Sequence, residues 1–565
     1  MQTINPKQKI VSSLRAILED AARRAMADGS LPKAELPAYS IETPKDPNHG
    51  DLSANLAMVG ARVFHCAPRA AAEALTAHID LKDSFFTRCE IAGPGFLNFF
   101  LSDEDIAPLT IQAILAAGKD YGRTQVENPQ KIMVEFVSAN PTGPMHIGNA
   151  RGGVIGDCLA ACLDACGEQV TREFYINDAG NQVERFALSL LARYREVCGD
   201  ETAQVPEDGY HGEDVLILAR AFHDEHFAQY GSEMTPELKE ALTAFGLARN
   251  IAAMQKHLGR FGVEYDVWFK ESSLHAGVEL SETMDLLKAS GHTYESEGAL
   301  WLRTTDFGCE KDDVLIRSNG FYTYFAVDIA YHRNKFLVRG FDRVINVWGA
   351  DHHGHVARLK AALSSLGIDP ERLHVVLMQM VRLMRDGEQV KVSKRSGKSI
   401  TLIDLLDEMP LDSARFFFNL RSPDSHFDVD LDLAVSNTSQ NPVYYVQYAH
   451  ARICSVLSLM QSEGIDISPE GADAALLKTP AEHALILLLA DLPEVIREAA
   501  ATYDPSQLTR YSIALATAFH KFYTECRVRD AEPELRRARI ALLHATRQTL
   551  ANTCALLGIS APEKM

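Results

Sequence analysis

The sequence has few cysteines, no long apolar run and a deficit of basic residues, and each shortage excludes a class of protein. Ten cysteines are spread over 565 residues without a CxxC pair, which argues against a disulfide framework and a cysteine-based zinc site. No stretch approaches the roughly 18 consecutive apolar residues of a membrane-spanning helix, and the N-terminus lacks the features of a signal peptide. These absences predict a cytoplasmic protein without membrane contact.

The charge of the chain is acidic overall but unevenly distributed. Acidic residues outnumber basic ones, 76 to 56, and the net charge of −20 argues against indiscriminate binding of nucleic acid. Residues 501–565 nevertheless contain nine basic and six acidic side chains, and residues 382–398 contain six basic and two acidic ones. Both segments are therefore positive and suited to face one anionic partner.

The length of the chain predicts at least three domains, because single hydrophobic cores stop growing near roughly 250–300 residues. Residues 1–120 combine a helical run at Gln8–Ala27, a second predicted helix at Leu52–Phe64 and an alternating strand at Phe96–Leu101. This mixture indicates an N-terminal α+β domain. Residues 436–565 have apolar side chains at helical spacing almost throughout, which indicates a C-terminal all-α helix bundle.

Residues 121–435 have the pattern of a Rossmann-type, doubly wound α/β domain. Helical segments such as the alanine-rich Asp157–Cys166 alternate with short apolar strands, and such alternation predicts a parallel sheet covered on both faces. A polar, acidic stretch near 190–297 has a helical pattern and is expected to interrupt the sheet as an insertion. The predicted strands are Ile132–Val137, Phe174–Ile176, Leu300–Arg303, Val344–Trp348 and His374–Met378.

A turn rich in proline and glycine follows the first of these strands. Pro141 stops the strand, and Gly143 and Gly148 remove side chains so that a nucleotide can approach the backbone. Ligands of doubly wound sheets bind at the carboxyl ends of strands, where the next helix presents free N–H groups to phosphate. His146 and Asn149 supply hydrogen-bond donors for charge that develops on a transferred phosphoryl group. A packed structural turn with a satisfied histidine fits the same residues.

A basic loop much further along the chain carries the second part of the pattern. Lys391, Lys394 and Arg395 lie between Gly387 and Gly397, and the flanking glycines permit the loop to move. Two lysines three residues apart can clamp a triphosphate and stabilise the departing pyrophosphate. A solvated basic loop is the alternative. Together, the turn and the loop predict a split site at which ATP activates a substrate.

Both segments resemble the signature motifs of class I aminoacyl-tRNA synthetases. His146-Ile-Gly-Asn149 is similar to their HIGH motif, with Asn149 in place of the second histidine. Lys391-Val-Ser-Lys-Arg395 is similar to their KMSKS motif, with Val392 and Arg395 in place of the methionine and the last serine. The stretches that narrow the resemblance to arginyl-tRNA synthetases are Asp46–Leu52, Val134–Asn140, Tyr175–Gln182, Tyr322–His332, Gly349–Gly354 and Asn441–Arg452.

The resemblance implies an arginine–tRNA ligase, which converts L-arginine and ATP to arginyl-adenylate and pyrophosphate and then transfers arginine to the 3′-terminal adenosine of its tRNA. The catalytic residues are expected to be His146, Asn149, Lys391 and Lys394. The residues expected to bind ATP are Pro141, Gly143, His146, Gly148, Asn149, Gly349, Asp351, Lys391, Ser393 and Lys394. A guanidinium requires a carboxylate and planar acceptors, and the residues expected to bind arginine are Glu135, Ser138, Asn140, Asn149, Tyr324 and Asp328.

The expected cofactor is Mg²⁺ that accompanies ATP, without a dedicated protein metal site. His352, His353 and His355 beside Asp351 would also suit a metal ion. The resemblance instead assigns this stretch to the adenosine of ATP.

The expected macromolecular partner is the tRNA for arginine. The resemblance assigns the C-terminal bundle to the anticodon end of tRNA and the N-terminal domain to its outer corner. Tyr444, Tyr445 and Tyr448 precede Arg452, and aromatic rings beside a basic residue can stack on unpaired bases, although this spacing is also typical of a helix core. No dimerisation segment is evident, so a monomer is expected. The alternatives are a non-catalytic synthetase-like protein that binds tRNA and another nucleotidyltransferase of the same superfamily.

Overall fold

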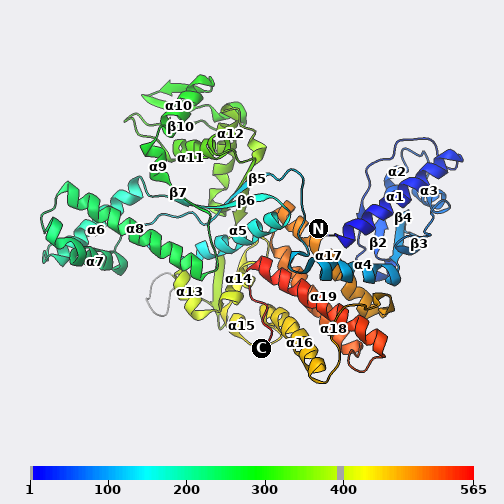
Figure 1. The fold of residues 1–565 in the computed structure, drawn as a ribbon. Coiled ribbons are helices and arrows are strands. Elements are labelled where there is room, and N and C mark those ends of the chain that lie inside the picture. Colours follow the sequence, from blue (N-terminus) through cyan, green and yellow to red (C-terminus); the bar gives the residue numbers. More distant parts are fainter. Residues whose placement is uncertain (1–3, 391–399) are drawn as a thin grey trace.

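The computed structural model describes residues 4–390 and 400–565. It consists of an N-terminal α+β domain, a central α/β domain with a parallel sheet, and a C-terminal helix bundle (Figure 1). This architecture confirms the predicted fold class. Lys391, Ser393 and Lys394, which were expected to bind ATP, lie outside the described residues. Within the described part of the chain, no helix is both long and apolar enough to cross a membrane.

The N-terminal domain contains a four-stranded antiparallel sheet with the strand order β1-β2-β4-β3. The predicted helix over Leu52–Phe64 is wrong at its start, because Leu52–Ala54 form strand β2. Leu52 is paired with Phe99 of β4, so the partner strand overrides the local helical spacing. The elements are α1 (Pro6–Ala27), β1 (Ile41–Glu42), β2 (Leu52–Ala54), α2 (Leu56–Gly60), α3 (Pro68–Thr76), β3 (Phe86–Ala92), β4 (Phe96–Leu101) and α4 (Asp103–Ala117).

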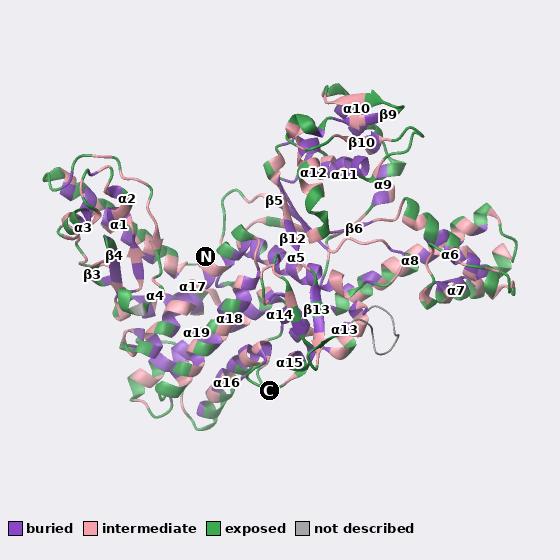
Figure 2. Cartoon of the chain, turned by 180° about the vertical axis from the view of Figure 1, so that it is seen from behind, coloured by how far each residue is buried: buried purple, intermediate pink, exposed green. Residues whose placement is uncertain are grey.

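The central domain is built on a five-stranded sheet, all parallel, with the strand order β12-β11-β5-β6-β7. Its apolar strands are buried because helices cover the sheet (Figure 2). Helix α5 packs so closely on β5 that a Cβ atom on Gly156 would overlap the ring of Phe136. The elements are β5 (Lys131–Glu135), α5 (Ile147–Ala165), β6 (Gln169–Ile176), β7 (Val267–Lys270), β11 (Arg343–Gly349), α12 (His353–Ser365) and β12 (Leu373–Met378).

The stretch 190–297 is only partly the helical insertion that the sequence predicted. It contains the second half of α6 (Asn181–Val197) and all of α7 (Glu213–Tyr230) and α8 (Pro236–Arg260), which project from the sheet in Figure 1. The helical prediction is wrong at Val267–Lys270, because these residues form β7 and pair with β6. The remaining elements of this stretch are α9 (Glu271–Ala276), α10 (Glu279–Ala289) and β8 (Thr293–Ser296).

The predicted strand Leu300–Arg303 exists but belongs to a different sheet. It corresponds to β9 (Ala299–Leu302), which forms a small antiparallel sheet with β8 and β10 (Asp313–Ile316). Helix α11 (Tyr324–Arg333) follows β10 and continues into a π-helical turn at Asn334–Val338. This connection brings α11 beside the central sheet.

The C-terminal bundle packs against both other domains. Helix α17 contacts α1 and α4 of the N-terminal domain and α5 of the central domain, so one apolar core runs through the three parts. The bundle helices are α16 (Pro442–Ser462), α17 (Pro480–Thr502), α18 (Ser506–Glu525) and α19 (Pro533–Leu557). The connecting elements are β13 (Val381–Arg385), β14 (Glu388–Gln389), α13 (Leu402–Glu408), α14 (Leu411–Phe418), β15 (Phe427–Asp430) and α15 (Leu431–Val435).

Candidate active site

The chain that follows the basic loop lies against the start of helix α5. The Ile147 N–H donates to the Ile400 carbonyl at 3.3 Å, and the Leu402 N–H donates to the Met145 carbonyl at 2.9 Å. His146 and Thr401 form an isolated antiparallel bridge between them. The first described residues after the basic loop therefore lie against the proline–glycine turn.

Strain is concentrated directly after strand β5. Val137 and Ser138 have φ angles of +70° and +39°, which are unfavourable for residues with a Cβ atom and for valine above all. The turn that follows is held by α8, because the Asn250 amide donates to the Pro141 carbonyl at 2.9 Å. The backbone thus leaves the sheet in a fixed, costly conformation, as is common at functional sites.

The two glycines of the turn have different surroundings. A Cβ atom on Gly148 would lie 2.9 Å from the Met380 Cε atom, but this atom ends a flexible side chain that is 58% exposed and can move aside. A Cβ atom on Gly143 would meet nothing nearer than the Asp214 carboxylate at 3.8 Å. Packing among the described residues therefore does not by itself require glycine at either position.

His146 and Asn149 lie at the N-terminus of α5, where the Asn149 N–H donates to the His146 carbonyl at 2.9 Å. His146 is the N-cap residue and is exposed. The Asn149 Oδ1 atom accepts a hydrogen bond from the His146 N–H at 3.0 Å. Asn149 lines both an outer hollow of about 1000 Å³ and an inner cavity of about 410 Å³, so it lies where the two meet.

The residues expected to bind arginine divide between these two spaces. Glu135, Ser138 and Asp328 line the inner cavity. Asn140 lines the outer hollow. Tyr324, the first residue of α11, is 51% exposed and is not among the described residues that line either space.

Asp328 carries a carboxylate that faces the inner cavity. Its Oδ2 atom accepts a hydrogen bond from His355 Nε2 at 2.8 Å. The Arg358 Nε–H donates to His355 Nδ1 at 2.6 Å, so the imidazole accepts on one nitrogen and donates on the other and is therefore neutral. Arg358 is itself paired with Asp313 at 3.1 Å. The negative charge of Asp328 thus has a hydrogen-bond partner but no charged partner in this chain of contacts.

Glu135 is the first member of a buried hydrogen-bonded network. Its Oε1 atom accepts from the Ser138 hydroxyl at 2.9 Å, and that hydroxyl oxygen accepts from the Tyr175 N–H at 3.1 Å. Its Oε2 atom forms an ion pair with Lys335. Lys335 also donates to the Asn346 Oδ1 atom at 3.2 Å. Both oxygens of Glu135 are therefore occupied.

The network continues to the backbone of Asp328. The Asn346 amide donates to His332 Nε2 at 2.9 Å, and His332 Nδ1 donates to the Asp328 carbonyl at 2.8 Å. Burial lowers the pKa of His332 well below its ordinary value, and the neighbouring Lys335 charge lowers it further. A neutral His332 has one donor and one acceptor nitrogen, as these two bonds require.

The stretch expected to contact adenosine follows strand β11. Gly349 and Asp351 both line the inner cavity. The Asp351 side chain is 82% exposed and lies 3.7 Å from His352, while His355 is the partner of Asp328. His352 therefore lies beside Asp351, whereas His355 binds the Asp328 carboxylate. Over the two described ranges, no group of three or more His, Cys, Asp or Glu side chains is arranged to hold a metal ion.

The aromatic residues of α16 form a partly exposed stack with a neighbouring helix. The rings of Tyr444 and Tyr448 are parallel within 6° at 6.1 Å, and His520 of α18 stacks on Tyr448 at 5.9 Å. Arg452 lies over Tyr448 and Tyr523. Burial lowers the pKa of His520 to about 4, so its ring is neutral. This combination of flat rings and one cation suits unpaired bases.

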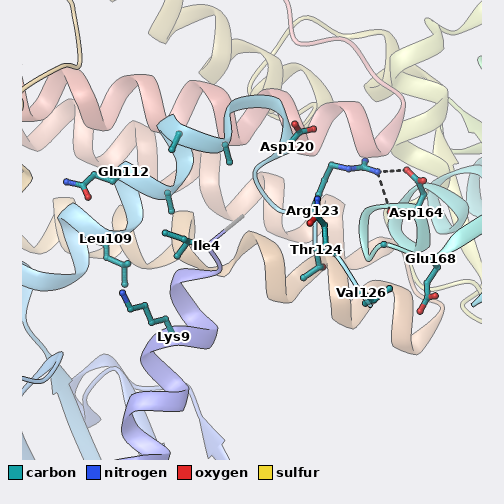
Figure 3. A pocket seen from close by; sticks show the side chains of 15 residues that line it. Ile4, Lys9, Leu109, Gln112, Asp120, Arg123, Thr124, Val126, Asp164 and Glu168 are labelled. Atoms are coloured by element: carbon teal, nitrogen blue, oxygen red, sulfur yellow. Dashed lines mark hydrogen bonds and ion pairs between the residues drawn. The ribbon is translucent and has the colours of Figure 1, made fainter. Parts of the chain in front are cut away.

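A further cavity lies elsewhere. It has a volume of about 1150 Å³ and is bordered by Lys9 of α1, Gln112 of α4 and the turn at Glu168 (Figure 3). Arg123 pairs with Asp164 at its edge at 2.7 Å. None of the residues that the sequence analysis assigned to a site lines this cavity.

Sequence reasoning missed several residues that build the inner cavity. Lys335 follows Arg333 and Asn334 and belongs to no motif. Tyr175 lies within a stretch that resembles the synthetase family and His355 directly follows another, Gly349–Gly354, which was the available signal for them. Trp348 and Met378 end the buried strands β11 and β12 and line the cavity, as expected where the carboxyl ends of parallel strands meet.

Three known protein families match the chain: the arginyl tRNA synthetase N-terminal domain over residues 8–101, the class I (R) tRNA synthetase catalytic domain over residues 110–453, and the DALR anticodon binding domain over residues 446–565. An arginine–tRNA ligase of Caldanaerobacter subterraneus subsp. tengcongensis is 50% identical over 562 residues, which are 99% of this chain and 100% of the relative. An arginine–tRNA ligase of Moorella thermoacetica is 50% identical over 567 residues and 100% of both chains. The solved structure of Thermus thermophilus arginyl-tRNA synthetase matches with a TM-score of 0.74 and 25% identity, covering 98% of this chain and 100% of that one.

Proposed function

Since the chain belongs to the arginyl-tRNA synthetases of class I and is thus an ATP-dependent arginine–tRNA ligase, we propose how its residues divide the work of that reaction. In the first step the carboxylate of arginine attacks the α-phosphorus of ATP, a P–O bond forms, and the bond to pyrophosphate breaks. In the second step the 2′-hydroxyl of the terminal adenosine of tRNA attacks the carbonyl carbon of the adenylate, and AMP leaves. Positioning and charge stabilisation supply the catalysis, and no protein nucleophile is required.

ATP occupies the outer hollow and the mouth of the inner cavity. His146 and Asn149, at the positive end of α5, donate hydrogen bonds to the phosphate that carries the developing charge. Lys391, Ser393 and Lys394 close over the triphosphate, an assignment supported by the contacts of Ile400 and Leu402 with the turn. Pro141, Gly143, Gly148, Gly349 and Asp351 shape the remaining walls.

Mg²⁺ enters as the counter-ion of ATP. The described residues contain no cluster of three carboxylates or histidines suited to a metal ion. Mg²⁺ characteristically keeps several waters and binds mainly through substrate phosphates. Mg²⁺ would neutralise phosphate charge there, while the protein residues orient the two reacting groups.

L-Arginine places its guanidinium against Asp328 in the inner cavity. The observation that carries this assignment is a carboxylate at the wall of a 410 Å³ cavity whose partner, His355, is a neutral imidazole. Glu135 and Ser138 form the opposite wall and offer acceptors, while Asn140 and Tyr324 meet the substrate from the outer side. A planar, permanently charged guanidinium matches such a fork of oxygens.

The tRNA spans all three parts of the molecule. The helix bundle over residues 436–565 receives the anticodon end, and the partly exposed stack of Tyr444, Tyr448 and His520 with Arg452 gives it a platform for unpaired bases. The N-terminal domain over residues 1–120 contacts the outer corner of the tRNA. The catalytic domain over residues 121–435 receives the 3′ end. We further propose that the chain works in the cytoplasm as a monomer. Light scattering of the purified protein tests the monomeric state, for which a mass of 62.4 kDa is expected.

The arginine assignment is tested by the substitution Asp328→Asn. Arginine-dependent ATP–pyrophosphate exchange is measured with tRNA present, and the KM for arginine is expected to rise about 100-fold, because a charge pair with the guanidinium is lost. The KM for ATP should stay within about twofold of the wild-type value. The substitution Asp285→Asn on the exposed face of α10 serves as control. An unchanged arginine KM in Asp328→Asn would remove this residue from the pocket.

A further inference from the structure

A fully buried lysine lies directly behind the proposed arginine pocket. Lys335 belongs to the π-helical turn that extends α11, and its side chain is 0% exposed. Turns of this kind occur frequently at functional sites. The turn directs Nζ to the Glu135 carboxylate and to the Asn346 amide oxygen, and Nζ lies 4.1 Å from the centroid of the Tyr331 ring. Lys335 is absent from the described residues that line the cavity, so it acts on the pocket through Glu135.

The other charges that face Glu135 cancel one another. Arg339 donates to both oxygens of Glu173 at 2.5 and 2.8 Å, and the Tyr331 hydroxyl donates to the same carboxylate at 2.5 Å. Burial raises the pKa of each tyrosine near Glu135, so these hydroxyls stay neutral; they are Tyr175, Tyr265 and Tyr331. The wall behind the pocket therefore consists of two neutral ion pairs and uncharged groups.

The groups on the other side of the pocket are also accounted for. His332 and His355 are neutral, as their hydrogen bonds require. Glu271 accepts a hydrogen bond from the Tyr175 hydroxyl at 2.8 Å, and burial raises the pKa of its carboxyl group. Asp328 and the largely exposed Asp351 thus contribute the negative charges that line the cavity, and Glu135 contributes oxygen acceptors whose charge Lys335 already balances.

We infer that Lys335 is a positioning residue: its buried ion pair keeps Glu135 ionised and stationary, so that arginine enters the pocket without releasing a proton. This inference rests on the proposed arginine site. A buried carboxylate that loses its cation near a second carboxylate takes up a proton. Arginine would then have to expel that proton, and its binding would weaken as the pH falls. Lys335 removes this dependence, so that Glu135 adds no unbalanced charge to the pocket.

The substitution Lys335→Met in the full chain tests the inference through a pH profile. The wild-type KM for arginine, measured by pyrophosphate exchange with tRNA, is expected to vary less than about twofold between pH 6.5 and 8.5. In Lys335→Met it should be about tenfold higher at pH 6.5 than at pH 8.5, because binding is coupled to the loss of one proton. Lys360→Met, which removes a lysine paired with Glu371 on the surface of α12, should retain the wild-type profile.

The double substitution Glu135→Gln/Lys335→Met separates charge pairing from packing. Its arginine KM should again be independent of pH, since no buried carboxylate is left without a cation. A flat profile in Lys335→Met, or a slope that persists in the double variant, would overturn the inference.

Wild-type protein provides a test that does not depend on the folding of a variant. Arginine binding is measured by titration calorimetry at pH 7 in two buffers with different ionisation enthalpies, and no net proton exchange is expected. Release of about one proton per arginine would contradict the inference. If Asp328→Asn leaves the arginine KM unchanged, the proposed pocket itself fails; if only the Lys335 results fail, the pocket stands without this role for Lys335.

Discussion

Asn149 combines a structural and a chemical task in one side chain. Its Oδ1 atom accepts the His146 N–H at 3.0 Å and so caps the start of α5. Its amide nitrogen is a hydrogen-bond donor that never carries a charge. The departure from the family signature is therefore compatible with an ordered helix start, and the proposed donor role toward phosphate is separable from the cap.

The substitutions Asn149→Ala and Asn149→Asp are expected to separate these tasks. Alanine removes the cap and the donor, so the free energy of unfolding should fall by about 1 kcal/mol and the kcat of pyrophosphate exchange by about 100-fold. Aspartate keeps the acceptor and suits the helix N-terminus, so stability should be retained. It also turns a negative charge toward the triphosphate, so kcat should fall at least as far as with alanine.

Denaturant unfolding gives the free energy of unfolding, and exchange kinetics give kcat. The substitution Asn128→Ala, at an exposed position, serves as control. A fully active Asn149→Asp enzyme would exclude the donor role.

Individual site residues were predictable where a sequence motif contained them. Glu135, Ser138 and Asp328 lie in such stretches, and the structure brings all three to the inner cavity. Lys335 could not be singled out, because a lysine within a helical run is ordinarily a solvated charge. Its burial depends on the π-helical turn, which rotates the side chains that follow α11. His355 could not be distinguished from His352 and His353 by pattern, because only its register on α12 directs it to Asp328.

At the scale of elements, the close contact between α5 and β5 positions the signature turn. Gly156 lies over the ring of Phe136, and a methyl group there would overlap the ring. The substitution Gly156→Ala should therefore lower the free energy of unfolding by about 2–3 kcal/mol. Gly259→Ala near the end of α8 meets nothing within 4 Å and should raise the free energy of unfolding by about 0.5–1 kcal/mol. Chemical denaturation of the two variants gives both values; equal effects would mean that α5 can shift away from β5 at little cost.

Long periodic elements were predictable, whereas strand partners were not. The sequence identified α1, β4 and β5 because their patterns are strong and local. The four-residue strand β7 was missed because a short apolar run shows no clear period. The strand β9 was assigned to the wrong sheet because its partner was not recognised. That partner is β8, which is joined to β9 by a two-residue turn, Glu297–Gly298, with φ angles of +52° and +74°. Glycine in such a tight turn was the available hairpin signal.

At the scale of the whole molecule, polar contacts fasten the N-terminal domain to the bundle. Lys7 of α1 pairs with Asp491 of α17 at 3.1 Å, and Lys478 pairs with Glu104 at 2.7 Å. At the centre, His483 of α17 contacts Asp51 at 2.9 Å and Asp103 at 2.5 Å. Because these two domains are proposed to hold different parts of one tRNA, their relative orientation bears on binding.

His483 should make the stability of this interface depend on pH. Burial alone would lower the pKa of His483, but hydrogen bonds and charge from Asp103 and Asp51 outweigh it and raise the pKa from 6.5 to about 9. A histidine with a raised pKa stabilises the fold fully below its unfolded value and loses that contribution as the pH rises through the folded value. The contribution is on the order of 3 kcal/mol at pH 6 and should vanish above about pH 9. The free energies of unfolding of wild type and His483→Gln should therefore differ at pH 6 and converge by about pH 9.5, whereas a variant with His49→Gln, at an exposed histidine of the N-terminal domain, should match wild type throughout. A wild-type advantage that is constant across this range would mean that His483 supports the interface by packing and not by charge.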